Sequence, residues 1–334
     1  MKIDIHDVTL RDGNHALRHS LQASQVSEYC KIANDSVAEV IEVGHGNGLG
    51  ASSYLVGKSS ALDYDLLSAA RESLTHRKLG VHIIPGFATF RRDVSVALDI
   101  GIDLYRVASH VTEADVCAPH IEKLADRQVI VHGVLMMSHM AELTQLAAEA
   151  RKLVGYGAVG VIIMDSAGTY RPETVSQRVQ VLRDALPEKI MIGFHAHNNL
   201  GFGLANAVAA ARAGADILDG SSAGLGAGAG NVHLELLGAW LNQEGEIRSS
   251  DFEKFMQMAE YVEATFTDYL PKISSQSVRS GLAGAFSGYS PQVKMASLAH
   301  SIPAQDIWSE VARRKLVAGQ ESVIWEIAQD LANL

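Results

Sequence analysis

The sequence predicts an α/β fold, a (β/α)8 TIM barrel followed by a helical C-terminal domain. Eight short runs rich in β-branched residues alternate with longer helical patterns through the first 245 of the 334 residues. Beyond residue 245 this alternation stops, and the remaining segments have helical patterns only. Polar residues directly follow several of the runs, at the end of a barrel strand where sites are usually built. We therefore divide the chain into a barrel, residues 1–245, and a helical domain, residues 246–334.

The expected strands are short and apolar and recur along the barrel. They are residues 3–8, 37–43, 79–84, 103–108, 129–136, 159–164, 189–194 and 216–218. Among the helices between them, residues 174–186 and 142–153 are well marked, and the latter places Leu143, Leu146 and Ala150 on one stripe. The helices expected in the C-terminal domain are residues 251–268, 275–281, 290–299, 303–312 and 321–331.

Composition excludes several classes of protein. The net charge is -10, and no cluster of Lys and Arg is interleaved with aromatic residues, so neither nucleic acid nor an anionic membrane is an expected partner. No apolar run reaches the length of a membrane span. Cys30 and Cys117 lie far apart, which does not suggest a disulfide framework. Because the chain opens directly on a strand with no signal peptide before it, we expect a cytoplasmic location.

Segments that follow the first and seventh strands contain the residue types that a divalent metal needs. Asp12 lies in the run TLRDGNH, and His195 and His197 lie in the run HAHNN. Alternate residues of an extended strand point to the same side, so the two imidazoles can bind one ion together with the carboxylate. Arg11 and His15 add a fixed cation and a group that titrates near neutral pH. This combination indicates a metal-assisted site that makes or stabilises an enolate.

Each of these residues also has a purely structural interpretation. The two histidines could bond to neighbouring loops, Asp12 could cap a helix or pair only with Arg11, and His15 could be an ordinary loop histidine. The combination favours the metal site, because a His-x-His pair after an apolar strand is much rarer than a single histidine. Ser166 follows Asp165 at the end of the sixth strand, and we interpret it as a substrate-binding residue rather than a turn serine.

Other conspicuous segments are weaker indicators of chemistry. The glycine-rich run 220–231 lacks the lysine of a phosphate-binding loop, so we expect it to form tight turns after the eighth strand. The loop 44–48 could belong to the barrel rim or cover a substrate. We expect the methionine-rich segment 136–140 to pack near the barrel mouth, and His110 and His132 to be structural.

Several of these motifs resemble those of a known enzyme family, the 4-hydroxy-2-oxovalerate aldolases. The resemblance lies in the runs DVTLRDGNHALRH, EVGHGNGLGASS, RVASHVTEADV, MDSAG, GFHAHNNLG and GLGAGAGN and in the tail LVAGQESVIWEIAQDL. The family belongs to a larger group of barrel enzymes that includes hydroxymethylglutaryl-CoA lyase and isopropylmalate synthase. The L-R-D-G and H-x-H-N elements are shared by this group, whereas the histidine three residues after the aspartate is typical of the aldolases.

The resemblance implies a pyruvate-specific class II aldolase, a carbon–carbon lyase. Such an enzyme cleaves 4-hydroxy-2-oxo acids to pyruvate and an aldehyde, reversibly, and its usual setting is aromatic hydrocarbon catabolism. By this resemblance Asp12, His195 and His197 bind a divalent ion, usually Mn²⁺, with Mg²⁺ or Co²⁺ as alternatives. Arg11 would stabilise the enolate and His15 would be the general base. The substrate contacts that the resemblance implies are Arg11, Asp12, Ser166 and His195.

The chain departs from the family in the C-terminal domain. The family motif G-L-A-G-V-Y-S-S-F supplies a tyrosine that reaches the substrate, but the corresponding run GLAGAFSGY places Phe286 at that position. We therefore expect either that Tyr289 reaches back to bind the substrate or that the pocket is reshaped for another aldehyde or the opposite stereochemistry at C4. Asn47 and His233 also replace residues that are common in the family.

The resemblance also implies a partner, an acylating acetaldehyde dehydrogenase that accepts the aldehyde product. We accordingly interpret residues 246–334 as a partner-binding domain and expect an oligomer, although an apolar helical tail would suit a homodimer equally. Two rival hypotheses remain open. A Claisen-type synthase or lyase acting on a CoA ester would share the fold and the metal, and a weakly active scaffold subunit is suggested by Phe286.

Overall fold

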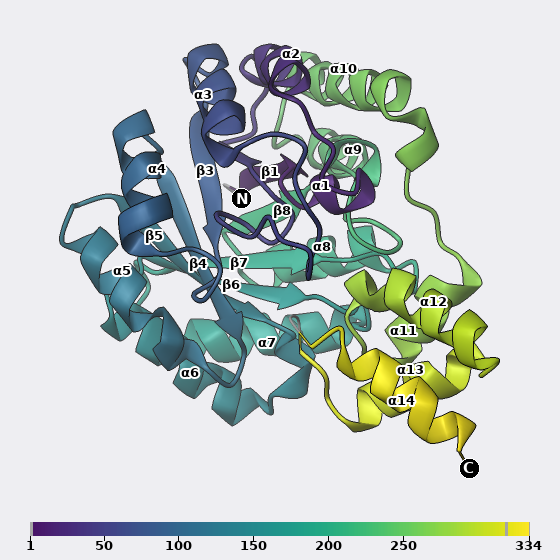
Figure 1. The fold of residues 1–334 in the computed structure, drawn as a ribbon. Helices are drawn as coiled ribbons and strands as arrows, with labels where there is room; N and C mark the ends of the chain where they lie inside the picture. The colour runs from purple at the N-terminus through teal and green to yellow at the C-terminus, as the bar shows by residue number, and fades with distance from the viewer. Residues whose placement is uncertain (1–2, 318–319, 334) are drawn as a thin grey trace.

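The fold was determined as a computed structural model that describes residues 3–317 and 320–333. Within these residues, eight parallel strands form a closed barrel in which each strand pairs with its neighbours in chain order and β1 pairs with β8 (Figure 1). Helices lie around the outside of the barrel, and a further group of helices follows it. The prediction of a (β/α)8 barrel with a helical C-terminal region is confirmed.

The strands of the barrel are β1 Asp4–Leu10, β2 Val40–Val43, β3 Lys78–Ile83, β4 Leu104–His110, β5 Ile130–Met136, β6 Gly160–Asp165, β7 Met191–Ala196 and β8 Ile217–Gly220. The helices that accompany them are α1 Gly13–Ala16, α2 Ala23–Ala33, α3 Asp63–Ser73, α4 Ser95–Ile100, α5 Ala118–Ala125, α6 Leu143–Gly155, α7 Pro172–Ala185, α8 Gly203–Arg212, α9 Leu234–Gln243 and α10 Ser249–Thr265. The last helices are α11 Ser275–Ala283, α12 Ser290–His300, α13 Ala304–Arg313 and α14 Val323–Ala332. Every expected strand is present, with ends that differ by at most three residues.

Helix α6 illustrates how the sequence seats a helix on the barrel. Leu146, Ala150 and Leu153 form its buried stripe, and Leu143, at the first helical residue, is only half-buried. Gly133 on β5 makes room for the Leu153 side chain of α6, because a methyl group at Gly133 would come within 2.7 Å of that side chain. The spacing of apolar residues and one glycine therefore fix how closely helix and strand approach.

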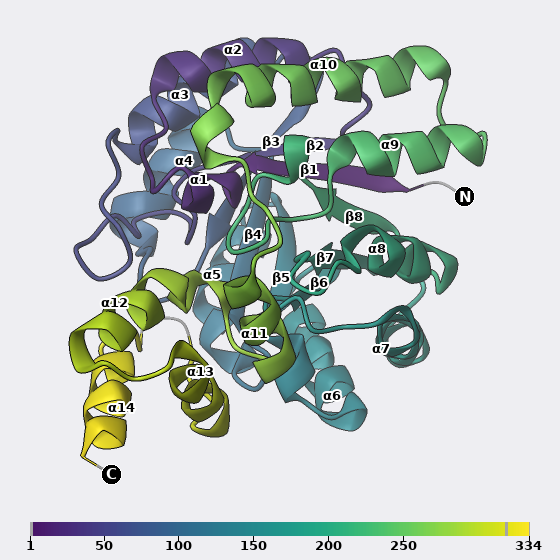
Figure 2. The same cartoon turned by 90° about the vertical axis from the view of Figure 1, so that its right-hand side faces the viewer.

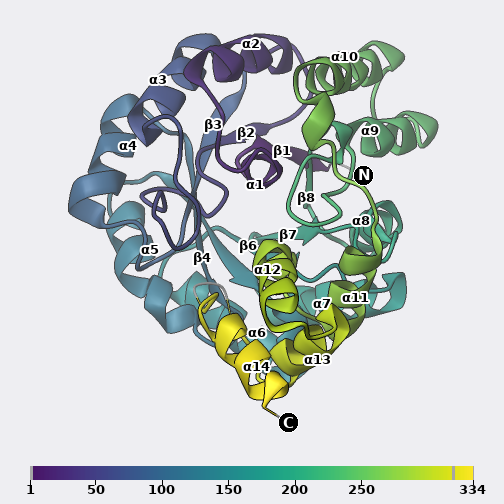
Figure 3. The same ribbon diagram turned by 45° about the vertical axis from the view of Figure 1, so that its right-hand side comes forward.

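The C-terminal helices divide between two hydrophobic cores. Phe255, Met258 and Val262 of α10 belong to the barrel core, and α10 packs on α2 and α9 (Figure 2). Helices α11–α14 build a second core around Tyr289 and Trp308, and they stand together as a separate group (Figure 3). The expected domain boundary after residue 245 therefore lies upstream of a helix that packs with the barrel.

Two further expectations concern membranes and thiols. Across the two described ranges, no helix combines the length and the apolar composition that a bilayer span requires. Cys30 and Cys117 are both buried and free, so neither belongs to a disulfide.

Candidate metal centre and active site

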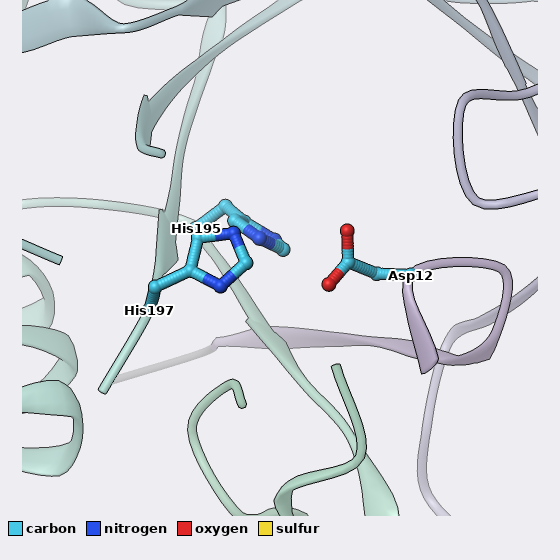
Figure 4. Close-up of side chains that lie close together, drawn as sticks. All are labelled: Asp12, His195 and His197. Atoms are coloured by element: carbon cyan, nitrogen blue, oxygen red, sulfur yellow. The ribbon is translucent and has the colours of Figure 1, made fainter. Parts of the chain in front are cut away.

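Three residues predicted to bind a metal lie together at the C-terminal end of the barrel strands. Asp12 follows β1, His195 lies near the end of β7, and His197 follows it. One side-chain ligand atom from each residue lies within 4.8 Å of those of the other two, and all three residues are buried. Figure 4 shows the Asp12 carboxylate facing the two imidazole rings. Residues about 180 positions apart therefore meet because all eight parallel strands of the barrel, β1 and β7 among them, end at the same rim.

The chemistry of these three residues fits a divalent cation. His195 Nε2 and His197 Nδ1 are buried and have no hydrogen-bond partner among the described residues, so their lone pairs are free for a ligand. Burial lowers the pKa of His197 to about 4, which keeps the imidazole neutral. Burial alone would raise the pKa of Asp12, but the Arg11 guanidinium and the two histidines hold that pKa well below its usual range. An ionised carboxylate and neutral imidazoles are the forms that bind metal.

Neighbouring polar groups orient the candidate ligands. His195 Nδ1 donates a hydrogen bond to Asp219 Oδ2 at 2.9 Å, which leaves Nε2 as the nitrogen that can bind a cation. Asn231 Nδ2 donates to Asp12 Oδ2 at 2.9 Å, and Arg11 Nη1 donates to Asp12 Oδ1 at 2.6 Å. The carboxylate is thus fixed from both of its oxygens before any ion binds.

A cavity of about 220 Å³ opens at this point of the barrel mouth. Six of the predicted site residues line it, namely Arg11, Asp12, His15, Ser166, His195 and His197. The remaining polar lining consists of Gly46, Asn47, His82, Ser109, His110 and Glu113, and the apolar lining of Ile84, Pro85, Phe87, Ala108, Val116, Met136, Met137, Met164, Phe286 and Val317. A small cavity that combines apolar walls with polar groups gathered around a cation site suits a small anionic ligand with an apolar part.

His15 lies in the cavity as a half-buried imidazole. Burial lowers its pKa, so the ring is neutral at pH 7 and can accept a proton. The ring packs edge-on against His19, with the ring centroids 5.2 Å apart, and His19 in turn stacks on His45 at 3.7 Å. The ring of Phe286 also lies edge-on to that of His15, with the centroids 6.5 Å apart, so His15 packs against both His19 and Phe286.

The comparisons with known proteins agree with this geometry. An HMGL-like family model matches residues 2–262, and a DmpG-like communication domain model matches residues 271–333. A 4-hydroxy-2-oxovalerate aldolase of Spirochaeta aurantia is 47% identical over 327 residues, 98% of this chain and 95% of that protein. The chain belongs to the 4-hydroxy-2-oxovalerate aldolase family. Another 4-hydroxy-2-oxovalerate aldolase, from Pectobacterium atrosepticum, is 46% identical over 99% of this chain and 96% of its own length. The resemblance found in the sequence motifs is confirmed.

A solved structure has the same fold at much lower sequence identity. The carboxyl transferase domain of Rhizobium etli pyruvate carboxylase superposes with a TM-score of 0.83 over 99% of this chain and 60% of that chain. Its sequence identity is 16%, so this likeness shows the shared architecture alone.

The structure separates two of the residues that we expected to bind the substrate, Ser166 and Tyr289. Ser166 lines the cavity, and its Oγ accepts a hydrogen bond from the Met137 backbone N–H at 3.0 Å. Tyr289, which we expected to reach back toward the substrate, is fully buried in the core of α11–α14 and does not line the cavity. Its ring packs perpendicular to that of Phe286, and Phe286 lines the cavity instead. The position of Tyr289 therefore does not support a direct contact with the substrate.

Sequence reasoning missed some of the residues around the cavity. His82 lies near the end of β3 and lines the cavity, but the apolar run around it resembles any buried strand. Burial lowers its pKa to about 3, so it adds a neutral polar group to the wall. His110, expected to be structural, lines the cavity as well, and the loop 44–48 contributes Gly46 and Asn47. A position close to the C-terminal end of a barrel strand was the available signal for both histidines.

Proposed function

We propose that this protein is a divalent-metal-dependent class II pyruvate aldolase that cleaves 4-hydroxy-2-oxo acids to pyruvate and an aldehyde and condenses them in the reverse direction. The observation that supports this proposal is the placement of Arg11 and His15 on the same cavity as the cluster Asp12, His195 and His197. The relatives named above are 4-hydroxy-2-oxovalerate aldolases at 46–47% identity, so we take 4-hydroxy-2-oxopentanoate as the substrate to test.

Asp12, His195 and His197 would hold the metal, for which we propose Mn²⁺, with Mg²⁺ or Co²⁺ as alternatives. When bound, the ion supplies a Lewis acid that draws electron density from the C2 carbonyl of the substrate. The Ser166 hydroxyl already accepts a hydrogen bond from Met137, so its own proton is available to the substrate carboxylate.

His15 is the general base of the proposed cleavage. Its neutral imidazole takes the proton of the C4 hydroxyl, and the C3–C4 bond breaks as the C4–O group becomes an aldehyde carbonyl. The electron pair of the broken bond forms the C2–C3 double bond, and the negative charge moves to the C2 oxygen. A proton added at C3 then yields pyruvate and balances the proton that His15 took.

Arg11 stabilises the charge that develops on the C2 oxygen. Its Nε is bonded to Glu42 and its Nη1 to Asp12, whereas its buried Nη2 has no hydrogen-bond partner among the described residues. A guanidinium that is already held by two carboxylates needs little reorganisation when the enolate forms. We assign Arg11 Nη2 as the donor to the enolate oxygen.

We further propose that helices α11–α14 bind an acylating acetaldehyde dehydrogenase. The match of residues 271–333 to a communication domain supports this, and Leu282 and Leu298 expose 74% and 73% of their surface there. Co-elution of the purified chain with such a dehydrogenase tests this proposal, with Leu282→Ser as a variant expected to weaken the complex.

Two buried free thiols also suit a reducing, cytoplasmic site of action.

Two assays separate the aldolase from its rivals. A Claisen-type enzyme would release a free thiol from acetyl-CoA mixed with a 2-oxo acid, and we expect no thiol release. A scaffold subunit would bind metal without turnover, and activity would emerge only after Phe286→Tyr. We expect the parent chain itself to release pyruvate from 4-hydroxy-2-oxopentanoate, and absence of release with every divalent metal tested would reject the proposal.

A further inference from the structure

A fully buried arginine joins two sides of the barrel beneath the cavity. Arg106 lies on β4, and its guanidinium donates to Glu42 Oε2 on β2 at 3.0 Å and to Asp219 Oδ2 on β8 at 2.6 Å. Neither β2 nor β8 is a neighbour of β4 in the barrel, so the side chain crosses the interior to make both bonds. Arg106 does not line the cavity.

Both carboxylates that Arg106 holds also hold a residue of the proposed active site. The second oxygen of Glu42, Oε1, accepts a hydrogen bond from Arg11 Nε. Asp219 Oδ2, the same oxygen that binds Arg106, accepts the hydrogen bond of His195 Nδ1 at 2.9 Å. A continuous chain of charged groups therefore runs from Arg11 through Glu42, Arg106 and Asp219 to His195.

From this chain of contacts we infer that Arg106 is a positioning residue that couples the proposed enolate-stabilising arginine to a proposed metal ligand. The inference rests on the proposed function, because it takes Arg11 and His195 in those two roles. By holding Asp219, Arg106 keeps a carboxylate at His195 Nδ1 and leaves Nε2 toward the ion. By holding Glu42, it fixes the fork of Arg11 and leaves Nη2 free.

The charge of the buried groups agrees with this role. Arg11 and Arg106 supply two guanidinium groups, and Asp12, Glu42 and Asp219 supply three carboxylates, all of them at most 5% exposed. The excess of one carboxylate suits a site that takes up a cation. A lysine at position 106 would keep the charge but would lose the planar fork that reaches two carboxylates at once.

The test compares Arg106→Lys with the parent chain and with Arg71→Lys as a matched control. Arg71 also bonds a carboxylate, Asp103 at 2.7 Å, but Asp103 precedes β4 at the opposite end of the barrel from the cavity. Two quantities are measured in each folded protein: the dissociation constant of Mn²⁺ by calorimetry without substrate, and the rate at which pyruvate methyl protons exchange with deuterium at saturating Mn²⁺.

We expect Arg106→Lys to weaken Mn²⁺ binding by about 10- to 100-fold, the effect typical of groups that orient metal ligands, and to slow pyruvate exchange even when the site is filled. Arg71→Lys should lower the melting temperature while leaving both quantities at the parent value. If Arg106→Lys does not fold, Asp219→Asn and Glu42→Gln take its place, with Mn²⁺ binding weakened in the first and exchange slowed in the second.

Different results overturn different claims. A folded Arg106→Lys chain with parent Mn²⁺ affinity and parent exchange rate would overturn the role of Arg106 and leave the proposed function intact. The same follows if Asp219→Asn binds Mn²⁺ as the parent does. A parent chain that binds no divalent ion would overturn both the inference and the proposed function.

Discussion

The imidazole ring of His15 lies directly against the backbone of Gly46, so closely that a methyl group on Gly46 would come within 2.6 Å of the ring atoms. The same glycine bonds two other groups of the site: its N–H donates to His19 Nδ1 at 3.4 Å, and its carbonyl oxygen accepts from Arg11 Nη1 at 3.3 Å. Gly46 therefore sets the distance between the proposed base and the proposed enolate-stabilising arginine.

The Gly46→Ala variant tests this placement. The φ angle of Gly46 lies outside the left-handed region, so alanine strains no backbone and acts only by pushing the His15 ring aside. We expect kcat for cleavage to fall about 10²-fold, as for a displacement of about 1 Å, with Mn²⁺ affinity unchanged. Gly155→Ala is the control, because its methyl group meets no atom within 4 Å. Parent kcat in Gly46→Ala would show that the position of His15 does not limit the reaction.

The hydrogen bond from Asn231 to Asp12 predicts an effect on metal affinity. In Asn231→Ala, Asp12 Oδ2 loses its donor at 2.9 Å and keeps only the Ala227 N–H at 3.5 Å. We expect Mn²⁺ binding to weaken by about tenfold or more, measured by calorimetry. Asn206→Ala removes a comparable buried bond, to the Tyr170 carbonyl, and should leave Mn²⁺ affinity at the parent value. If Asn231→Ala bound Mn²⁺ as tightly as the parent and the Asn206→Ala control do, the orienting role of Asn231 would be contradicted.

The buried hydroxyl of Tyr289 predicts a stabilising substitution. This hydroxyl has no hydrogen-bond partner among the described residues, so it bears a desolvation cost without a compensating bond. Tyr289→Phe should raise the free energy of unfolding by about 1 kcal/mol, measured by urea denaturation. The KM for 4-hydroxy-2-oxopentanoate should not change. A higher KM would instead support the contact with the substrate that we expected of Tyr289 from the sequence.

Buried histidines outside the metal cluster predict that acid weakens the fold. Burial lowers the pKa of His6, His45 and His139 to about 4 and that of His82 to about 3. Between pH 6.5 and these values the unfolded chain binds more protons at these histidines, so the free energy of unfolding falls as pH falls. Burial also raises the pKa of Asp7 and Asp165 to about 6, which acts in the opposite direction. Four histidines outnumber two carboxyl groups, and stability should decrease from pH 6.5 to 4.5.

His139 offers a direct check of this pH dependence. Its Nε2 donates to the Gly284 carbonyl oxygen at 2.9 Å, between the barrel and the C-terminal helices, and glutamine can keep that bond without titrating. In urea denaturation near pH 5, His139→Gln should lose stability with acid less steeply, by about 1.4 kcal/mol per pH unit. Identical slopes in parent and variant would show that His139 is not the acid-sensitive group.

Features encoded in short stretches of sequence could be predicted. The eight strands follow from local apolar runs, and the meeting of Asp12 with His195 and His197 follows from the rule that barrel strands end at one rim. The family motifs added roles for Arg11 and His15. Each of these inferences needs only a few residues that are neighbours in the sequence and the knowledge that all strands of a (β/α)8 barrel end at one rim.

Features that depend on contacts between distant residues could not be predicted. Helix α10 has the same pattern as any amphipathic helix, and only its packing on α2 shows that it joins the barrel core. Arg106 lies in an apolar strand 64 residues from Glu42 and 113 from Asp219, and no local pattern connects the three. Tyr289 was expected to replace the family tyrosine that is lost at position 286, but where Tyr289 lies depends on how α11–α14 pack together.

The measurement that tests the account most directly is pyruvate release from 4-hydroxy-2-oxopentanoate by metal-stripped protein, with and without added Mn²⁺, beside the His15→Ala variant. The account predicts release that requires Mn²⁺ and is reduced by about 10²-fold or more in His15→Ala, because a positioned general base supplies that much of the rate. Release that is independent of added metal, or equal in the parent and His15→Ala chains, would contradict the assignment of the metal cluster and the base.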